Sequence, residues 1–364
     1  MTSSKPTVLH YVTQWLWLSD TFVHGPVTAT EHGKAIVSRG EIINQHVYPY
    51  PGVISLTEPD GSLPDEGAPT ADVVVAKLGG ARPSLVHLHH GYGLPDARAI
   101  ARRLSVPLIT SFWGYDITAL PKSDPARFAG AFEDIDRVVV PSRYLARLAR
   151  EAGASEEQIR IIPGGLDCVF FEPTPLPSAP RVAFVGRFVE KKGIDVLLRA
   201  WESVRAGIPD AELTLLGYGE RAPETDAGAG IRVLTPDPAE PRKQVRDLLR
   251  WSRLYVSPSR TAASGDGEGQ HMGNLEAQAS GRPVVTTAHT AIPEFVLDGE
   301  TGLVVPENDV DAVAEAIVAL LRDDERSAAL AKNGTAWAQN FDVSVAARRH
   351  DELYAEVIGA DVVN

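Results

Sequence analysis

Two basic residues, Arg187 and Lys192, lie in a short turn between an apolar run and a helical one. The apolar run ends at Gly186, and the helical sequence IDVLLRAW begins after Gly193. The amino end of a helix offers free backbone N–H groups and the positive end of the helix dipole, and two cations beside it add full charges. The segment 184–193 therefore predicts an anion-binding turn. A solvated basic turn is the alternative that its composition leaves open.

A second group of polar residues lies in DGEGQHMGNLEAQASGRPVV, which spans 266–285. A helix that begins near Asn274 places Glu276 in its first turn and Glu268 on the loop before it, so that both carboxylates face one ligand. Backbone N–H groups from Met272 to Leu275 then meet a phosphate or a sugar hydroxyl at this helix N-terminus. Exposed carboxylates are the alternative, because two Glu at this spacing are common.

The elements that position these groups alternate in type along the 364 residues. Short apolar runs followed by amphipathic segments are typical of parallel sheets with crossover helices, so we predict the α/β class. A helix is predicted over 26–39, with Gly40 after its end. The predicted strands cover 8–12, 42–48, 85–89, 108–111, 138–140, 182–185, 212–216, 231–234, 254–256 and 283–286.

The chain is longer than one hydrophobic core usually fills, so two domains are expected. The Pro-rich stretch FEPTPLPSAP at 171–180 suits neither helix nor sheet and predicts the linker. We therefore expect domains over 1–175 and 176–342, with a C-terminal helix at about 343–360 packing back on the first. Ligands of such folds bind in a cleft between the two domains.

Composition narrows the partners and the compartment. The formal net charge of -13 argues against a nucleic-acid partner. A single cysteine, Cys168, suits a reducing cytoplasm. No signal-peptide core is predicted, and no apolar run approaches the roughly 18 residues of a spanning helix. Membrane contact is thus expected to be peripheral at most, at the inner face. The oligomeric state does not follow from the sequence.

The second half resembles the donor half of family 4 glycosyltransferases. The similarity rests on FVGRFVEKKGIDVLLRAW, LTLLGYG, EGQHMGNLEAQASGRPVVTT and IPEFVLDGETGLVVPENDV, which occur in order and register. The resemblance implies a GT-B fold of two Rossmann-like domains facing across a cleft. It also implies retention of anomeric configuration, no metal and no resident cofactor, with a nucleotide diphosphate sugar as co-substrate.

The same resemblance implies a role for each candidate residue of the second half. Arg187 and Lys192 bind the donor pyrophosphate and stabilise charge on the leaving group. Glu276 accepts hydrogen bonds from the ribose, and Glu268 lies near the transferred sugar. Residues His271 to Asn274 line the sugar and phosphate, and Gly186, Gly273 and Leu275 are further donor-binding candidates. Gly164 and Gly165, and Gly217 with Gly219, let the backbone approach the nucleotide closely.

The first half is similar to the family's acceptor half through SLVHLHHG, PLITSFWGYDIT and VVVPSRYLARLAREAGASEEQIRIIPGGLD. The expected acceptor is a glycan, a lipid-linked glycan or a small natural product, with a role in polysaccharide or glycoconjugate biosynthesis. Two family features are absent: Trp113 stands where HGxD has its histidine, and the double glycine after the first strand is missing. The candidate contacts to sugar or acceptor are Ser19, Thr21, Gly25, His89, His90, Trp113 and Asp116.

Three other functions compete with this interpretation, and Arg187 with Lys192 argues against the second of them, a glycosidase. Gly217, Gly219 and Ala222 fit a loose GxGxxA, followed by Asp237, which would suit an NAD-dependent oxidoreductase. Paired glutamates also occur in glycosidases, although hydrolysis has no use for a diphosphate grip. A catalytically inactive sugar-nucleotide-binding protein of the same fold is the third.

Overall fold

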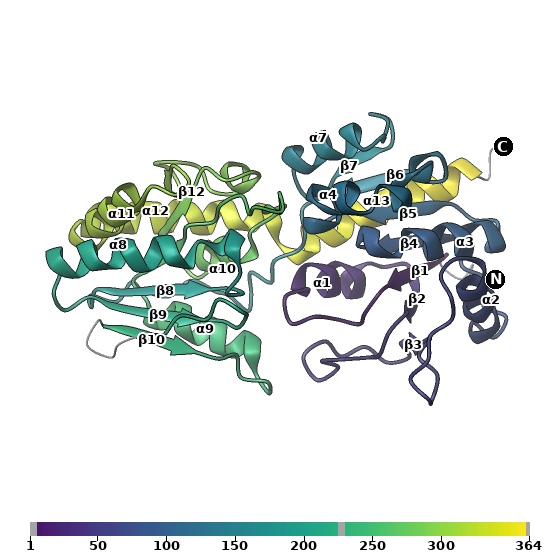
Figure 1. Cartoon of the computed structure of the whole chain (residues 1–364), viewed down its shortest axis with the longest axis horizontal. Helices are drawn as coiled ribbons and strands as arrows, with labels where there is room; N and C mark the ends of the chain where they lie inside the picture. Colours follow the sequence, from purple (N-terminus) through teal and green to yellow (C-terminus); the bar gives the residue numbers. More distant parts are fainter. Residues whose placement is uncertain (1–5, 225–229, 362–364) are drawn as a thin grey trace. The chain divides into compact units, whose positions relative to one another are not determined.

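The computed structural model describes residues 6–224 and 230–361, and the chain divides into two compact units. Unit 1 contains the residues up to Gly165 together with the chain from Val343 onward, and unit 2 runs from Leu166 to Asp342. Each unit has one parallel sheet flanked by helices (Figure 1). None of the described helices is long and apolar enough to cross a membrane.

The sheet of unit 1 has seven strands in the order β3-β2-β1-β4-β5-β6-β7. The strands are β1 (Thr7–Val12), β2 (Gly33–Ser38), β3 (Ile54–Ser55), β4 (Leu85–His89), β5 (Leu108–Ser111), β6 (Arg137–Val140) and β7 (Ile159–Ile161). The helices are α1 (Thr21–Ala29), α2 (Ala68–Lys77), α3 (Leu94–Leu104), α4 (Tyr115–Thr118), α5 (Leu120–Ser123), α6 (Pro125–Phe128), α7 (Arg143–Glu151) and α13 (Val343–Asp361).

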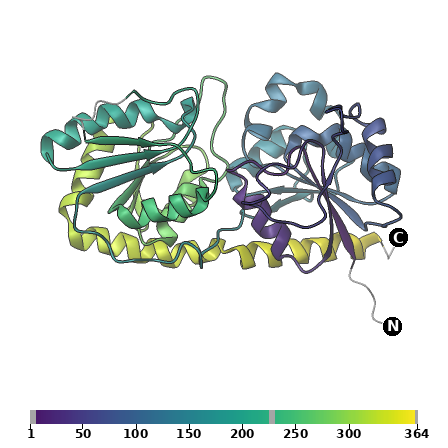
Figure 2. The same cartoon turned by 90° about the horizontal axis from the view of Figure 1, so that it is seen from below.

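Side chains of unit 1 alternate between the two faces of its sheet because successive strand residues point to opposite sides. On one face, Leu9 and Leu88 join the core formed with α2, α3 and α7. On the other face, Val8 and Leu85 pack against Leu353 and neighbouring residues of α13. Figure 2 shows α13 running along this second face.

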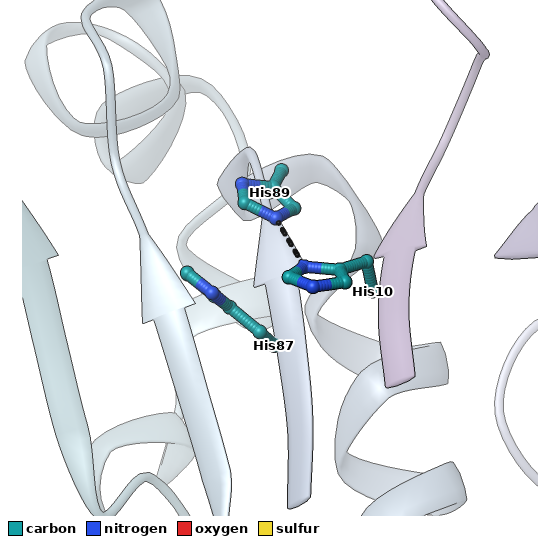
Figure 3. Close-up of side chains that lie close together, drawn as sticks. All are labelled: His10, His87 and His89. Atoms are coloured by element: carbon teal, nitrogen blue, oxygen red, sulfur yellow. Dashed lines mark hydrogen bonds between the residues drawn. The ribbon is translucent and has the colours of Figure 1, made fainter. Parts of the chain in front are cut away.

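The face that α13 covers also carries three buried histidines. His10 of β1 stands opposite His87 in the register with β4, and His89 lies two residues further along β4 (Figure 3). Burial lowers the pKa of His10 to about 3 and the pKa values of His87 and His89 well below their ordinary range. All three rings are therefore neutral.

The sheet of unit 2 has six strands in the order β10-β9-β8-β11-β12-β13. The strands are β8 (Arg181–Val185), β9 (Glu212–Leu216), β10 (Ile231–Leu234), β11 (Leu254–Ser257), β12 (Val284–Thr287) and β13 (Gly302–Val305). The helices are α8 (Ile194–Gly207), α9 (Pro241–Trp251), α10 (Met272–Ala279), α11 (Val310–Arg322) and α12 (Asp324–Ala338), with a short 3-10 turn η3 (Glu190–Lys192).

One part of the predicted element pattern is wrong. The predicted helix over 26–39 is instead the end of α1, a turn and strand β2, and the predicted strand over 42–48 is irregular. The apolar residues Ala35, Ile36 and Val37 suit a strand. This strand, β2, pairs with β1 on one side and with β3 on the other. Pro26 lies inside α1 rather than at its first turn.

Two glycines of unit 2 allow backbone segments to touch. A Cβ at Gly217 would overlap the carbonyl oxygen of Gly186, and one at Gly193 would overlap the carbonyl oxygen of Pro258. Gly193 also has φ +63°, which favours glycine. The loops after β8, β9 and β11 therefore pack at distances that no other residue type permits.

We expect Gly217→Ala to lower the free energy of unfolding by about 1 to 3 kcal/mol, because the added methyl group must push two loops apart. Gly359→Ala is the matched control, since its added methyl group meets no atom within 4 Å. Urea unfolding followed by circular dichroism measures both. Equal stabilities of the two variants would contradict the close approach.

Candidate functional site

The candidate residues of unit 2 follow two neighbouring central strands. Strands β8 and β11 pair in parallel, and the strand order reverses between them. Ligands of doubly wound sheets bind outside the carboxyl ends of the strands at such a point. Arg187 and η3 follow β8, and the loop 258–271 with Glu268 follows β11. The sheet topology therefore brings the two predicted groups to one edge.

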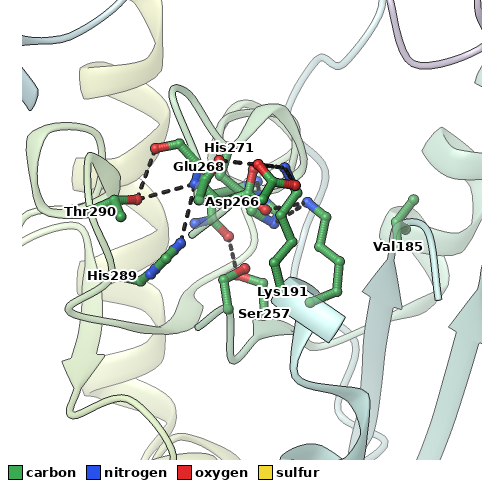
Figure 4. A network of polar contacts seen from close by, with 12 residues as sticks. Val185, Lys191, Ser257, Asp266, Glu268, His271, His289 and Thr290 are labelled. Carbon is green, nitrogen blue, oxygen red and sulfur yellow. Dashed lines mark hydrogen bonds and ion pairs between the residues drawn. The ribbon is translucent and has the colours of Figure 1, made fainter. Parts of the chain in front are cut away.

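Two ion pairs join η3 to the loop 258–271. Lys191 Nζ lies 3.1 Å from a carboxylate oxygen of Asp266, and Lys192 Nζ lies 2.8 Å from Oε1 of Glu268. Figure 4 shows this network of polar contacts. Arg187 is exposed, and among residues 6–224 and 230–361 no carboxylate lies within ion-pair distance of its guanidinium. The guanidinium of Arg187 is therefore open to an anionic ligand.

Burial and charge act in opposite directions on the inner ion pair. Burial lowers the pKa of Lys192 from its ordinary value, while the neighbouring Glu268 carboxylate favours the ammonium form. Burial alone would raise the pKa of Glu268, but the ammonium groups of Lys192 and Lys191 outweigh it and hold that pKa well below its ordinary value. Each partner of the pair therefore favours the charged form of the other and opposes the effect of burial.

His271 connects this ion pair to helix α10. Burial lowers its pKa to about 3, so its ring is neutral and carries one proton. Its Nδ1 accepts the backbone N–H of Asn274, which places the proton on Nε2. Nε2 lies 3.1 Å from Nζ of Lys192, so two donors face each other. An anionic oxygen within hydrogen-bond distance of both nitrogens would accept from both.

Glu276 lies on α10 and is half-buried. Burial raises the pKa of its carboxyl to about 7, against the opposing charges of Arg242 and Lys192. Because α10 begins at Met272, Glu276 belongs to its second turn and not to its first as the sequence predicted. In the first turn of the same helix, a Cβ at Gly273 would collide with the hydroxyl of Tyr255.

Two of the predicted donor contacts have internal roles. The side chain of Asn274 is buried and bonds the hydroxyls of Ser257 and Thr286 at 2.6 and 3.3 Å. Leu275 is fully buried in the core. These residues anchor α10, while the half-buried Met272 and Gly273 remain at its first turn.

Sequence reasoning missed the chain of bonds that holds the backbone of Glu268. The backbone N–H of Glu268 donates to Nε2 of the buried His289 at 3.1 Å. The opposite nitrogen, Nδ1, lies 2.8 Å from Oε1 of Glu307, so it carries the proton. The hydroxyl of Thr290 bonds both the N–H and the carbonyl of Glu268. No local spacing signals this role, because the partners lie 18 and 21 residues apart.

We expect His289→Phe to speed amide hydrogen exchange at Glu268, because one acceptor of that N–H is removed. The loss of one hydrogen bond of about 1 kcal/mol corresponds to roughly fivefold faster exchange. Glu307→Gln should have a smaller effect, since an amide oxygen still accepts the imidazole N–H. Glu300→Gln, at an exposed position, serves as the control. Unchanged exchange in His289→Phe would refute the hydrogen bond from the Glu268 N–H to His289.

In unit 1, the side chain of Asp116 binds backbone N–H groups of the surrounding loops. Its two carboxylate oxygens accept the N–H groups of Gly91, Trp113 and Gly114 at 2.8 to 3.0 Å. Trp113 is buried against Phe22, with ring centroids 4.7 Å apart, and its Nε1–H lacks a partner within the described chain. His90 lies beside it with φ +74° and stands 3.9 and 4.0 Å from carboxylates of Asp20 and Asp116.

The remaining candidates of unit 1 are His89, Gly25, Ser19 and Thr21, of which only His89 is buried. The ring of His89 is buried, and its Nε2 lies 3.1 Å from Nδ1 of His10. Gly25 faces Val343 at the start of α13. Ser19 bonds the carboxylate of Asp20 at 3.4 Å, and Thr21 begins α1.

The dinucleotide-binding alternative has no structural support. The loose GxGxxA at 217–222 requires a helix directly after the strand, but the described residues 217–224 form turns and loop. A Cβ at Gly219 would collide with the backbone of Phe188, which explains this glycine by packing.

Two Rossmann-like units, each built on a sheet of parallel strands, define the GT-B fold. Solved structures share it at low sequence identity. HepE of Anabaena in complex with UDP matches with a TM-score of 0.76 and 16% identity, covering 96% of this chain and all (100%) of that one. Sucrose-phosphate synthase of Thermosynechococcus elongatus matches with a TM-score of 0.75 and 20% identity, covering 98% and 100%.

Family comparisons agree over most of the chain. The description "Glycosyltransferase Family 4" matches residues 27–170, and "Glycosyl transferases group 1" matches residues 179–323. The chain belongs to the family 4 glycosyltransferases.

Curated relatives include enzymes of lipid and polysaccharide assembly. A GDP-mannose-dependent alpha-(1-6)-phosphatidylinositol monomannoside mannosyltransferase of Mycolicibacterium smegmatis is 33% identical over 66% of this chain and 66% of its own length. The putative colanic acid biosynthesis glycosyltransferase WcaL of Escherichia coli is 31% identical over 60% and 56%. The chain thus spans about two thirds or less of the length of these two relatives.

Proposed function

We propose that this protein is a retaining glycosyltransferase that moves a hexosyl group from a nucleotide diphosphate sugar to a glycan, a lipid-linked glycan or a natural product. The observation that carries the proposal is the convergence of Arg187, Lys192, Glu268 and Glu276 on one sheet edge at the reversal of strand order. Polysaccharide or glycoconjugate biosynthesis is the proposed role, supported by the names of its relatives.

The diphosphate is proposed to bind between Arg187 and Lys192. Arg187 is exposed and free of carboxylate partners in the described chain, and Lys192 and His271 present two facing N–H donors. A phosphate oxygen accepts from both donors and relieves their repulsion. As the bond to the sugar breaks, negative charge grows on this phosphate, and preorganised cations stabilise it without a metal.

The acceptor hydroxyl is proposed to attack the anomeric carbon on the face that the diphosphate leaves. The carbon–oxygen bond to the diphosphate breaks, a new carbon–oxygen bond forms on the same side, and the leaving phosphate oxygen takes the hydroxyl proton. Glu268 is assigned to positioning and charge balance, because its carboxylate is already the counterion of Lys192.

Unit 2 is proposed to bind the donor and unit 1 the acceptor. Among the acceptor-side candidates of unit 1, we assign Trp113 and His90 to the acceptor, because Nε1 of Trp113 and Nε2 of His90 have no hydrogen-bond partner within the described chain. His89 also has an unbonded nitrogen, but its ring faces His10 inside the sheet. The proposed location is the cytoplasm, with peripheral contact at the inner membrane face when the acceptor is lipid-linked.

We expect Lys192→Ala to weaken nucleoside diphosphate binding by roughly 10- to 100-fold, the value of a charged hydrogen bond of about 1.5 to 3 kcal/mol. Thermal shift with UDP, GDP, ADP and TDP identifies the base, and titration calorimetry gives Kd. The exposed Lys332→Ala in the same unit is the control. Equal Kd values for wild type and Lys192→Ala would remove the proposed diphosphate site.

Activity is tested with the matching nucleotide sugars and extracted lipid or glycan acceptors. Release of the nucleoside diphosphate reports transfer, and proton NMR of the product reports the anomeric configuration. Inversion would contradict the proposed same-face attack. Nucleotide binding without turnover with any acceptor would favour the inactive sugar-nucleotide-binding alternative.

Binding of the matching nucleoside diphosphate should depend on pH through Glu276. Its pKa of about 7 leaves the carboxyl half protonated at neutral pH, and only the ionised form accepts two ribose hydrogen bonds. We therefore expect tighter binding as pH rises from 6 to 8. Glu276→Gln should bind more weakly and lose this dependence, leaving only the titration of the phosphate itself. A profile unchanged in Glu276→Gln would exclude contact between this carboxylate and the ribose.

A further inference from the structure

The three buried histidines of unit 1 form a cluster that the proposed transfer does not use. One ring nitrogen from each of His10, His87 and His89 lies within 4.8 Å of the others. The ring of His10 comes from β1 and those of His87 and His89 come from β4, and the three lie close together (Figure 3). Complete burial of three imidazoles on one sheet face is costly unless their polar atoms are satisfied.

Hydrogen bonding within the protein leaves one nitrogen of His10 and one of His89 without a partner in the described chain. Nδ1 of His10 and Nε2 of His89 lie 3.1 Å apart, so one donates and the other accepts. Their second nitrogens, Nε2 of His10 and Nδ1 of His89, have no partner within the described chain. Two neutral rings carry two protons and two lone pairs, so this pairing leaves one of each unused.

The separation of the paired nitrogens also fits two ligands of one metal ion. Zinc–nitrogen bonds of about 2.0–2.1 Å place two ligand nitrogens of a tetrahedral site roughly 3.3 Å apart. The 3.1 Å contact between His10 and His89 is close to that value. A shared ion would use the lone pair of every ring, whereas the hydrogen-bonded pair uses only one.

His87 has a hydroxyl partner at each ring nitrogen, so a metal ion bound to one nitrogen would displace that partner. Its Nδ1 lies 2.7 Å from the hydroxyl of Tyr354, and its Nε2 lies 2.7 Å from the hydroxyl of Ser111. When one nitrogen ligates, the other donates to its hydroxyl, which fixes the tautomer of the ligand. Neutral imidazoles without carboxylates select zinc, copper or nickel over magnesium or calcium.

A fourth imidazole lies beside the cluster. His350 of α13 donates its Nδ1–H to the carbonyl oxygen of Ala346 at 2.8 Å, because a carbonyl only accepts. Its Nε2 therefore carries the lone pair, and its ring lies 5.7 Å from that of His87. A further imidazole thus lies near the histidine-bearing strands, on the helix that covers them.

We propose that His10, His87 and His89 bind one divalent transition-metal ion, zinc in the first instance, as a structural site between β1 and β4 under α13. Because the site is buried, the ion enters during folding and adds its binding free energy to the stability of unit 1. This site lies within unit 1 and is independent of the donor site proposed in unit 2.

The test uses the full chain without an affinity tag, expressed with added zinc and exchanged into metal-free buffer. Inductively coupled plasma mass spectrometry should find about one zinc per chain. The metal should be lost in His10→Phe and His89→Phe, which keep an aromatic ring and remove a ligand. It should be retained in His46→Gln, which changes an exposed histidine of the same unit.

Refolding from denaturant separates metal binding from folding of the variants. Wild-type protein refolded with zinc should melt at a higher temperature than protein refolded with a chelator. Refolding with cobalt should give the visible absorption of a tetrahedral nitrogen site. Absence of bound metal from wild-type protein after refolding with zinc and after refolding with cobalt would overturn the proposal, even if the variants fail to fold. Zinc held equally by wild type and His10→Phe would overturn it as an adventitious ion only.

Discussion

The ion pair between Lys192 and Glu268 is the interaction on which the candidate site depends. It joins the turn after β8 to the loop after β11, and Lys191 with Asp266 makes a second link beside it. Burying one such charge alone would be prohibitive, so each lysine is placed by its carboxylate. Within the pair, the Glu268 carboxylate favours the ammonium form of Lys192 and so opposes the lowering of its pKa by burial.

Several contacts around this ion pair hold its two loops in position. Glycines at 193 and 217 let the neighbouring loops approach, and His289 with Glu307 fixes the backbone of Glu268. His271 caps α10 with one nitrogen and turns the other toward Lys192. The resulting arrangement has more donors than acceptors near Lys192, which favours an anionic ligand.

The two units use similar sheets for different chemistry. In unit 2 the edge at the strand reversal between β8 and β11 carries cations, whereas in unit 1 the reversal lies between β1 and β4, which carry buried neutral histidines. Asp116 shows why one half of the HGxD pattern can persist alone. Its carboxylate binds three backbone N–H groups of its own loop, a role that does not need the histidine replaced by Trp113.

The sequence by itself determined the fold class and most strands, because buried parallel strands are short apolar runs between polar turns. The predicted strands at 85–89, 108–111, 212–216 and 231–234 have those bounds in the structure. The turn with Arg187 and Lys192 was also evident, since its chemistry is local. The region 26–48 was misread because an apolar run of three residues does not distinguish a strand from part of a helix.

Only the tertiary structure decided which distant residues meet. Glu268 and Lys192 lie far apart in the chain, and their pairing follows from the adjacency of β8 and β11. The roles of His289 and Glu307, and the meeting of His10 with His87 and His89, follow likewise from strand order and register. Residue type and spacing specify what a side chain can do, but neighbours are set by how the strands pair.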